Sequence, residues 1–536
     1  MTPLLHDWVS QRAIESPDSI AVVEGEERMT YGEFETRSGR LAAVLTSHGV
    51  RSGDRVALLV PKSIRALVAI HGVLKAGGVY IPIDTNSPSA RIEKIIESSE
   101  PRLVLADRNS SKLLPELRMD SPSANTPLVG WLEQGVPAPV DIAFSAADVA
   151  SAAPADSRVD GGSEDLAHIL FTSGSTGMPK GVSITHGNVS AFVEWAVQHF
   201  NIGPDDRNSG HHPLHFDLST FDMYGTFAAG AELHLVPPSL NLLATKLAGF
   251  IRNHGLTQWF SVPSALNYMA HFDVAQAGSF PSLRRLMWCG EVLPTKTLMY
   301  WMRHLPDVEF TNLYGPTEAT IASSYYRVPV RPKSETESVP IGMACDNESL
   351  HVLDEAMDPV PRGDIGDLYI GGVGLSPGYW RDAEKTQAAF RTKEFPDGPL
   401  RIYRTGDLAR IDEAGLVHYL GREDSQIKSR GYRIELGEIE TAVSAIEGLG
   451  ECAVVAVDSD GFAGKVVCCA YTLRPGHDLT AAHIRKALAR AVPRYMLPAH
   501  WMEMEVLPKN ANGKIDRRAI RERMSLEQRT STPTVR

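Results

Sequence analysis

A chain of 536 residues is too long for one ordinary hydrophobic core, so we expect two or three packed units. Hydrophobic residues make up 43% and charged residues 22% of the sequence, which is typical of a globular protein. The formal net charge of −12 argues against nonspecific nucleic-acid binding through phosphates. Residues 421–536 carry a small excess of Lys and Arg, which fits either an acidic partner or ordinary surface variation.

The cysteines are odd in number and scattered, and they form no pattern that predicts a zinc site. The N-terminal residues include early charges and lack the apolar stretch of a signal peptide. No run of about 18 apolar residues predicts a membrane span. We therefore expect a cytoplasmic protein without membrane contact, in the reducing compartment where free cysteines are the default.

Short apolar runs alternate with amphipathic runs in the first part of the chain. The predicted strands are 19–25, 55–61 and 101–107, and the predicted helices are 32–49 and 63–77. This alternation indicates α/β layers with largely parallel sheets. A stretch rich in Ala, Pro, Ser and Asp, 125–163, predicts a loosely structured connection.

A second set of strands and helices is expected over 165–330, and short strands with Gly, Pro and Asp turns over 349–419 predict a small β-rich unit. After residue 420 the pattern predicts a compact α+β domain. The predicted division is a core at 1–420, a hinge at 421–424, a C-terminal domain at 425–524 and a flexible tail at 525–536.

A loop rich in glycine and hydroxyl residues, FTSGSTGMPKG at 171–181, follows the apolar run 166–171. Backbone N–H groups and hydroxyls in such a loop can donate to phosphate oxygens, and Lys180 adds a positive charge. The loop is not a Walker A motif, because GxxxxGK[ST] is absent. On composition alone, a flexible turn is an equal alternative. A second glycine-rich stretch, 371–374, lacks the third glycine and the following helix of a dinucleotide-binding loop.

The order of motifs along the chain carries a family resemblance. The motifs are KAGGVYIP (75–82), the loop at 171–181, FDLS (216–219), NLYGPTE (312–318), GDLYIGG (366–372), YRTGD (403–407), GREDSQIK (421–428), RGYRIE (430–435) and NGKID (512–516). With them the chain resembles the adenylate-forming enzymes, and within these the amino-acid adenylation domains of nonribosomal peptide synthetases. The resemblance implies a large N-terminal domain of layered α/β subdomains with a small β-rich unit, and a smaller mobile α+β C-terminal domain.

The resemblance also implies a ligase of natural-product biosynthesis, such as antibiotic biosynthesis. Such an enzyme uses ATP and Mg²⁺ to activate an amino acid as aminoacyl-AMP and then loads the phosphopantetheine thiol of a carrier protein. The sequence shows no phosphopantetheine attachment motif of its own, so we expect a freestanding enzyme with a separate carrier protein.

The ATP site implied by the resemblance has roles that suit its residue types. Tyr314 offers a flat face to adenine and Asn312 offers an amide to its edge. Glu318 is a hard oxygen ligand for Mg²⁺, and the Asp407 carboxylate can accept both ribose hydroxyls. Arg422 is expected at the ribose or a phosphate. The predicted ATP-binding residues are Thr172, Ser173, Gly174, Ser175, Thr176, Gly177, Lys180, Gly290, Glu291, Asn312, Tyr314, Gly315, Thr317, Asp407, Arg422 and Lys514, and the predicted catalytic residues are Thr176, Glu318 and Lys514.

Lys514 resembles the family's catalytic lysine. A compact cation there can hold the substrate carboxylate against the α-phosphate and neutralise charge that develops on phosphorus. Asp424 matches the family's hinge position, although a surface turn residue is the alternative. A rotation at the hinge would withdraw Lys514 and present the face around Lys428 and Arg430 for the second half-reaction.

The resemblance places the amino-acid pocket at ten positions. These are Asp217, Leu218, Phe221, Ser264, Met287, Cys289, Leu313, Ile321, Ala322 and Lys514. Asp217 would bind the substrate ammonium through a charge-assisted hydrogen bond, and Asp222 is a possible rival. The remaining positions are mostly apolar, which predicts a small or medium neutral amino acid. The segment CGEVLP (289–294) resembles D-alanine–carrier protein ligases and favours alanine over proline, serine or a β-amino acid.

Cys289 lies in an apolar run without an obvious base nearby, so we expect it to be an inert pocket residue and not a nucleophile. Candidate carrier contacts are Arg485, Lys486, Arg490 and Arg494, for which a solvated helix face is the alternative. Two other functions remain open from the sequence. An acid–coenzyme A ligase shares the fold but does not need Asp217, and a non-catalytic nucleotide-binding protein does not need the predicted catalytic residues.

Overall fold

The structure is a computed structural model that describes residues 2–118, 126–155, 161–174, 178–422, 426–458, 464–510 and 515–531, the last four without side chains. The chain divides into two compact units. The first unit comprises Met1–Thr85, Ile96–Phe171 and Gly181–Glu423, and the second comprises Asn86–Ile95, Thr172–Lys180 and Asp424–Arg536. The second unit therefore contains two short segments, 86–95 and 172–180, in addition to the C-terminal residues.

Within the described residues, the larger sheet of the first unit has nine strands in the order β16-β15-β14-β13-β12-β10-β11-β1-β2. The six strands from β14 to β1 run parallel, and β2, β15 and β16 join antiparallel at the two edges. The bounds are β1 Ile20–Glu24, β2 Glu27–Thr30, β10 Arg207–Gly210, β11 Glu232–Leu235, β12 Gln258–Ser261, β13 Arg285–Trp288, β14 Glu309–Tyr314, β15 Ser324–Arg327 and β16 Met343–Ala344.

A second sheet of the first unit has the strand order β19-β9-β8-β4-β3-β5-β6-β7. Its bounds are β3 Arg55–Leu59, β4 Val79–Pro82, β5 Leu103–Ala106, β6 Leu128–Trp131, β7 Phe144–Ser145, β8 Leu166–Thr172, β9 Lys180–Thr185 and β19 Gly378–Tyr379. The predicted strands at 19–25, 55–61 and 101–107 are confirmed as β1, β3 and β5. The stretch 125–163, predicted to be loosely structured, instead holds β6, β7 and the helix α5 (Ala146–Ser151).

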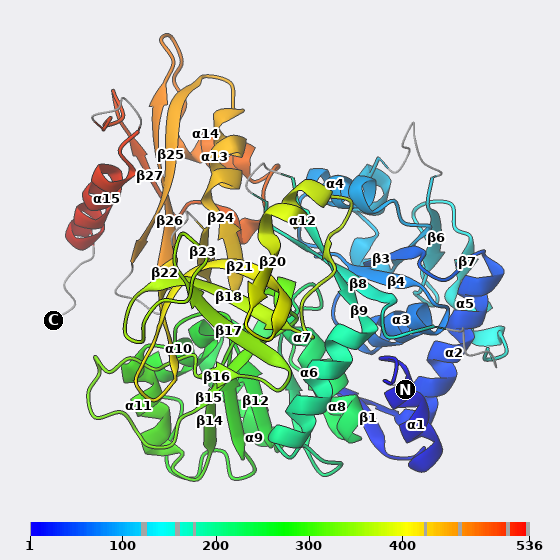
Figure 1. The fold of residues 1–536 in the computed structure, drawn as a ribbon. Helices are drawn as coiled ribbons and strands as arrows, with labels where there is room; N and C mark the ends of the chain where they lie inside the picture. The colour runs from blue at the N-terminus through cyan, green and yellow to red at the C-terminus, as the bar shows by residue number, and fades with distance from the viewer. Residues whose placement is uncertain are drawn as a thin grey trace. The chain divides into compact units, whose positions relative to one another are not determined.

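Helices pack between and beside these two sheets (Figure 1). Phe34 of α2, His71 of α3 and Phe227 of α8 meet in edge-to-face ring contacts, which join helices that are far apart in sequence. The helices of the first unit are α1 Asp7–Glu15, α2 Tyr31–Ser47, α3 Ile64–Lys75, α5, α6 His186–His199, α7 Leu218–Thr220, α8 Thr226–Ala229, α9 Ala244–Asn253, α10 Pro263–His271, α11 Thr295–His304 and α12 Ala383–Ala389, and α4 Ser89–Ser99 extends into the first unit from segment 86–95.

The predicted β-rich unit is a five-stranded antiparallel sheet. Four of its strands follow the order β17-β18-β21-β20, and the fifth strand, β22, also pairs with β21. Its strands are β17 Glu348–Leu353, β18 Gly366–Gly372, β20 Phe390–Phe395, β21 Gly398–Ile411 and β22 Val417–Arg422.

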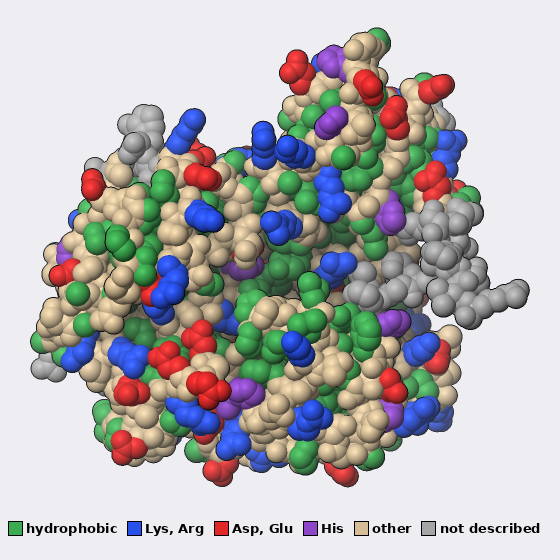
Figure 2. Space-filling view, turned by 180° about the vertical axis from the view of Figure 1, so that it is seen from behind, with side chains coloured by type: hydrophobic (Ala, Val, Ile, Leu, Met, Phe, Trp, Pro, Cys, Tyr) green, Lys and Arg blue, Asp and Glu red, His purple; other side chains and the backbone are tan. Residues whose placement is uncertain are grey.

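Positive and negative side chains are interspersed over the face shown in Figure 2, as expected for ordinary solvated surface. No helix in the described part of the chain is long and apolar enough to cross a bilayer.

The second unit contains a hairpin and a three-stranded sheet that is covered on both faces. Helices α13 and α14 share one hydrophobic cluster with Val454 and Cys469, whereas α15 shares another with Val455 and Cys468 (Figure 1). Successive strand residues therefore face opposite helices. The bounds are β23 Gln426–Ser429, β24 Tyr432–Glu435, α13 Leu436–Ser444, β25 Leu449–Asp458, β26 Lys465–Leu473, α14 Ala481–Leu488, β27 His500–Glu503 and α15 Arg517–Ser531.

Helix α15 differs from the prediction of a flexible tail from residue 525. It continues to Ser531, so the first part of that predicted tail is helical. Ile520 and Met524 are spaced four residues apart and lie on one face of the helix, where they are 0% and 2% exposed. Burial of this pair fixes the helix on the sheet, and the polar sequence beyond it did not reveal that anchor.

Candidate active site

Four neighbouring parallel strands of the larger sheet end at the same edge. They are β10, β12, β13 and β14, and each is followed by residues that the sequence assigned to the site. In strand order, these residues are Asp217 after β10, Ser264 after β12, Cys289, Gly290 and Glu291 after β13, and Gly315, Thr317 and Glu318 after β14. The carboxyl edge of a parallel sheet is the usual position of a ligand site in α/β proteins.

The apolar pocket positions all lie in the large hydrophobic cluster of the first unit, and we call these seven side chains the apolar wall. Each of its side chains is at most 4% exposed. Phe221 packs edge-to-face on Phe260, with ring centroids 5.5 Å apart. The members of the apolar wall are Leu218, Phe221, Met287, Cys289, Leu313, Ile321 and Ala322. Seven positions chosen from sequence motifs are thus all buried in the main hydrophobic core of the first unit.

Ser264 and Glu291 belong to the same edge and contact each other. The backbone N–H of Ser264 donates to Oε2 of Glu291 at 3.1 Å, near the start of α10. A carboxylate at that end of a helix is favoured, because the first turn presents unpaired N–H groups. Glu291 therefore has a local role in α10 besides any contact to nucleotide.

Asp217 and its rival Asp222 have different surroundings. Asp222 is 4% exposed and accepts hydrogen bonds from the backbone N–H of His212 at 3.2 Å and from its Nδ1 at 2.9 Å. Asp217 is only half-buried and precedes the short helix α7. Asp217 is the more exposed of the two carboxylates, which favours it over the buried Asp222 for contact with a substrate ammonium.

The chain around these acids contains a turn that sequence reasoning did not anticipate. Residues Phe221–Gly225 form a π-helical turn between α7 and α8. Such turns are rare and frequently occur at functional sites. The sequence carries no cue for this register, since local propensity does not distinguish a π-helical turn from an α-helical one.

Three predicted ATP-site residues form a second cluster, which we call the polar corner: Tyr314, Asp407 and Arg422. The Tyr314 hydroxyl donates to Oδ2 of Asp407, and Nη1 of Arg422 lies 2.7 Å from Oδ1 of the same carboxylate. Asp407 and Arg422 face each other across the β21–β22 pair. Burial, and then the neighbouring Asp407 charge, hold the pKa of Tyr314 far above its usual range. A ribose that binds Asp407 must share or replace these bonds.

Asn312 and Glu318 flank the end of β14. Nδ2 of Asn312 donates to the carbonyl of Pro340 at 2.9 Å, which commits its amide nitrogen to the main chain. Glu318 is 0% exposed, and its Oε1 accepts a hydrogen bond from the Tyr379 hydroxyl at 2.9 Å. An oriented carboxylate suits Mg²⁺ as a single hard ligand. In the described part of the chain, no group of three or more His, Cys, Asp or Glu side chains could hold a metal ion by itself.

The backbone after Glu318 is strained. Thr320 and Ile321 have φ values of +53° and +71°, and the N–H of Ala322 donates to the carbonyl of Thr320 at 2.9 Å. This is a γ-turn centred on a β-branched residue, a conformation that costs on the order of 1–3 kcal/mol per residue. Gly315 lies beside it, and a Cβ there would approach Cα of Ala322 to 2.5 Å. The turn was not predicted, because nothing in a β-branched pair signals positive φ.

The start of the predicted phosphate loop lies in the second unit. There Oγ of Ser173 donates to the carbonyl of Arg433 at 2.8 Å, and the N–H of Gly174 donates to Oε2 of Glu438 at 3.2 Å. Glu438 is also paired with Arg91. Thr172 and Lys180 begin and end this segment. The predicted residues that lie outside the described residues are Ser175, Thr176, Gly177, Asp424 and Lys514.

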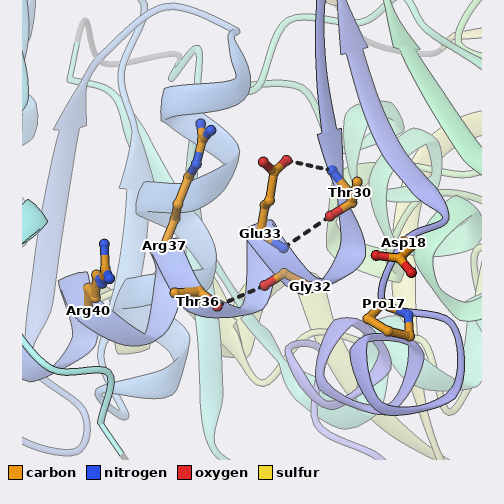
Figure 3. A pocket seen from close by; sticks show the side chains of 8 residues that line it. All are labelled: Pro17, Asp18, Thr30, Gly32, Glu33, Thr36, Arg37 and Arg40. Atoms are coloured by element: carbon orange, nitrogen blue, oxygen red, sulfur yellow. Dashed lines mark hydrogen bonds between the residues drawn. The ribbon is translucent and has the colours of Figure 1, made fainter.

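A surface hollow of about 400 Å³ lies beside the start of α2 (Figure 3). Thr30 and Glu33 form the capping box of that helix, with hydrogen bonds of 3.2 and 3.0 Å between side chain and backbone. The hollow is lined by Pro17, Asp18, Thr30, Gly32, Glu33, Thr36, Arg37 and Arg40. None of the predicted site residues lines it, so it is a feature of the helix start and not part of the candidate site.

Known protein families and individual proteins are similar to this chain over most of its length. The model for the AMP-binding enzyme matches residues 9–380, and the model for the AMP-binding enzyme C-terminal domain matches residues 438–514. An L-proline–[L-prolyl-carrier protein] ligase of Streptomyces coelicolor is 36% identical over 505 residues, with 92% of each protein covered. Tyrocidine synthase 3 of Brevibacillus parabrevis is 36% identical over 516 residues and 96% of this chain, which spans only 8% of that much longer protein.

A solved structure of an adenylation domain is also similar to this chain. The adenylation domain AlmE of Vibrio cholerae, in complex with glycyl-adenosine-5′-phosphate, has a TM-score of 0.82 and 26% identity, and 97% of this chain and 98% of AlmE are covered. The chain belongs to the AMP-binding enzyme family. Within that family, the relatives it resembles include an amino acid–carrier protein ligase and an amino-acid adenylation domain.

Proposed function

We propose that this ligase activates a small neutral amino acid as aminoacyl-AMP and transfers the aminoacyl group to the phosphopantetheine thiol of a separate carrier protein. The observation that carries the proposal is the half-buried Asp217 at the strand edge that also holds the uncharged apolar wall. One carboxylate beside an apolar surface suits a substrate with an ammonium group and a neutral side chain.

The substrate class is supported by two relatives. One is named as acting on L-proline, and another was solved with a glycyl adenylate. Both amino acids are small and uncharged. We propose alanine as the first candidate, followed by proline, serine and a β-amino acid, because hydrophobic pockets separate neighbouring sizes by only about 1–3 kcal/mol.

In the first half-reaction, Asp217 holds the ammonium and Lys514 draws the substrate carboxylate toward the α-phosphorus of ATP. A carboxylate oxygen forms the new bond to phosphorus as the bond to pyrophosphate breaks, and pyrophosphate leaves with the electron pair. Asp407 and Tyr314 orient the nucleoside. Glu318 would hold Mg²⁺, which supplies positive charge to the phosphates when it is bound.

In the second half-reaction, the carrier thiolate attacks the acyl carbon and AMP leaves. We propose a core at 1–420, a hinge at 421–424 that includes Asp424, and a mobile domain at 425–524. Contacts to an acidic carrier are proposed for basic side chains of the second unit, all at exposed positions on or after α14: Arg485, Lys486, Arg490 and Arg494.

ATP–pyrophosphate exchange with a panel of amino acids tests the proposal. We expect exchange with small neutral amino acids, and we expect Asp217→Ala to lose amino-acid binding while it keeps ATP binding, measured by calorimetry. The exposed Asp205→Ala is the matched control and should behave as wild type. If no amino acid supports exchange, the proposal fails. Thioester formation with free coenzyme A in place of a carrier would redirect it to an acid–coenzyme A ligase.

A further inference from the structure

The strained turn at Ile321 is attached to a second loop of the first unit, 372–376. The N–H of Ser376 donates to the carbonyl of Glu318 at 2.9 Å, and Oγ1 of Thr320 donates to the carbonyl of Gly374 at 2.7 Å. Thr320 and Ser376 are both buried, so loss of either hydrogen bond would leave a buried polar group without a partner and would cost stability. The Thr320 hydroxyl is therefore a direct link from the apolar wall to this loop.

The loop is held equally firmly from its other side. The N–H of Gly374 donates to Oε1 of Glu348 at 2.6 Å, and Nδ2 of Asn188 donates to the carbonyl of Val373 at 2.8 Å. A Cβ at Gly374 would come within 2.7 Å of Oε1 of Glu348 and 2.9 Å of the carbonyl of Ala319. Gly374 is thus fixed at both its N–H and its carbonyl, in a space that admits only glycine.

Burial of the Glu348 side chain lowers the stability of the folded protein. Its Oε2 is buried and has no hydrogen-bond partner in the described part of the chain. A buried polar atom without a partner costs stability, and such local conflicts are expected where a site requires them. The turn has the same character, because positive φ at Thr320 and Ile321 persists only if surrounding contacts impose it.

We propose that Thr320 and Glu348 are positioning residues that determine which amino acids this enzyme accepts. They hold Gly374 from opposite sides, and Gly374 in turn keeps Ile321 and Ala322 pressed into the apolar wall. Loss of either contact lets the turn relax, which changes the room left for the substrate side chain. The inference rests on the proposed function, since it takes Ile321 and Ala322 as part of the amino-acid pocket.

The test compares substitutions that remove each contact with substitutions that keep it. Thr320→Val removes the hydroxyl at constant size and Thr320→Ser keeps it, while Glu348→Ala removes the acceptor and Glu348→Gln keeps it. Thr392→Val and Glu394→Ala, at exposed positions of β20, are matched controls. The readout is the ratio of kcat/KM, by pyrophosphate exchange, for the preferred amino acid to that for one a methylene larger.

We expect the Val and Ala variants to lower this ratio about tenfold, with the KM for ATP within about twofold of wild type. The Ser, Gln and control variants should keep the wild-type ratio. The ratio is taken within one preparation, so partial unfolding cancels. If both kcat/KM values fall equally in the Val and Ala variants, the residues are merely structural and the inference is overturned. If one variant of the pair cannot fold, the other decides.

Failure of the proposed function looks different. In that case the wild-type enzyme exchanges with no amino acid in the panel. A wild type that is active and selective, with an unchanged ratio in Thr320→Val and Glu348→Ala, would overturn only the present inference.

Discussion

The apolar wall and the polar corner lie in the same unit but are built from different contacts. The apolar wall is a set of buried hydrophobic side chains whose shape depends on backbone turns, including the strained one at Ile321. The polar corner is a small network in which one carboxylate, Asp407, satisfies two partners. Packing tolerates small changes in shape, whereas a buried charge network does not tolerate loss of a member.

This contrast suggests how the site divides its work. Changes in the apolar wall should alter which amino acid is used and leave the nucleotide chemistry intact. Changes in the polar corner should impair ATP use for every amino acid alike. Substitutions in the polar corner and in the apolar wall test this division separately.

The largest effect is expected for Asp407→Asn. The substitution removes the charge that pairs with the largely buried Arg422, and loss of one partner of such a pair costs about 3–5 kcal/mol. We expect kcat/KM for ATP to fall about 100-fold or more, with the ranking of amino acids unchanged. Initial rates of exchange at varied ATP measure this. Asp397→Asn, on an exposed turn, should be silent, and an altered amino-acid ranking in Asp407→Asn would contradict the division.

A smaller effect is expected for Cys289→Ala. The thiol is 1% exposed in the apolar wall, with no role assigned in catalysis, so activity should persist. The space left by sulfur should favour larger amino acids by up to about tenfold, with a loss of about 1 kcal/mol in unfolding free energy. Amino-acid panels and thermal denaturation report the two effects. Cys468→Ala, a buried thiol of the second unit, should leave the ranking alone, and an inactive Cys289→Ala would revive a covalent role.

The third prediction concerns stability and not activity, namely its dependence on pH. Burial raises the pKa of Glu348 from its usual 4.5 to about 8, while the hydrogen bond from Gly374 opposes the shift. The folded state therefore keeps a proton that the unfolded state releases, and wild-type stability falls as pH rises from about 5 to about 8. Glu348→Gln lacks this proton, so its Tm relative to wild type should climb across that window and level off above it. A Tm difference that is flat between pH 5 and pH 8 would contradict the assignment.

Much of the fold was predictable from the sequence. Strands such as β3 and β5 are short apolar runs between turn residues, and helices such as α2 and α3 have clear amphipathic spacing. The elements that were missed depend on tertiary partners. Strands β6 and β7 exist because they extend an existing sheet, and α15 continues because two of its side chains are buried.

The candidate site follows the same rule. Family motifs indicated residues that follow strands of the larger sheet, although the sequence analysis did not place those strands individually. Three features could not be predicted: the shared carboxylate of the polar corner, the π-helical turn and the γ-turn at Ile321. The polar corner and the γ-turn involve contacts between segments that are distant in the chain, and local propensity is silent about such contacts.

The anchoring of α15 has a practical consequence. Ile520 and Met524 close one face of the three-stranded sheet, whose residues on that side are uniformly apolar. A protein truncated before Ile520 would expose that hydrophobic surface to water. It would tend to self-associate and precipitate, so affinity tags and fusion partners are better joined beyond the last turn of the helix.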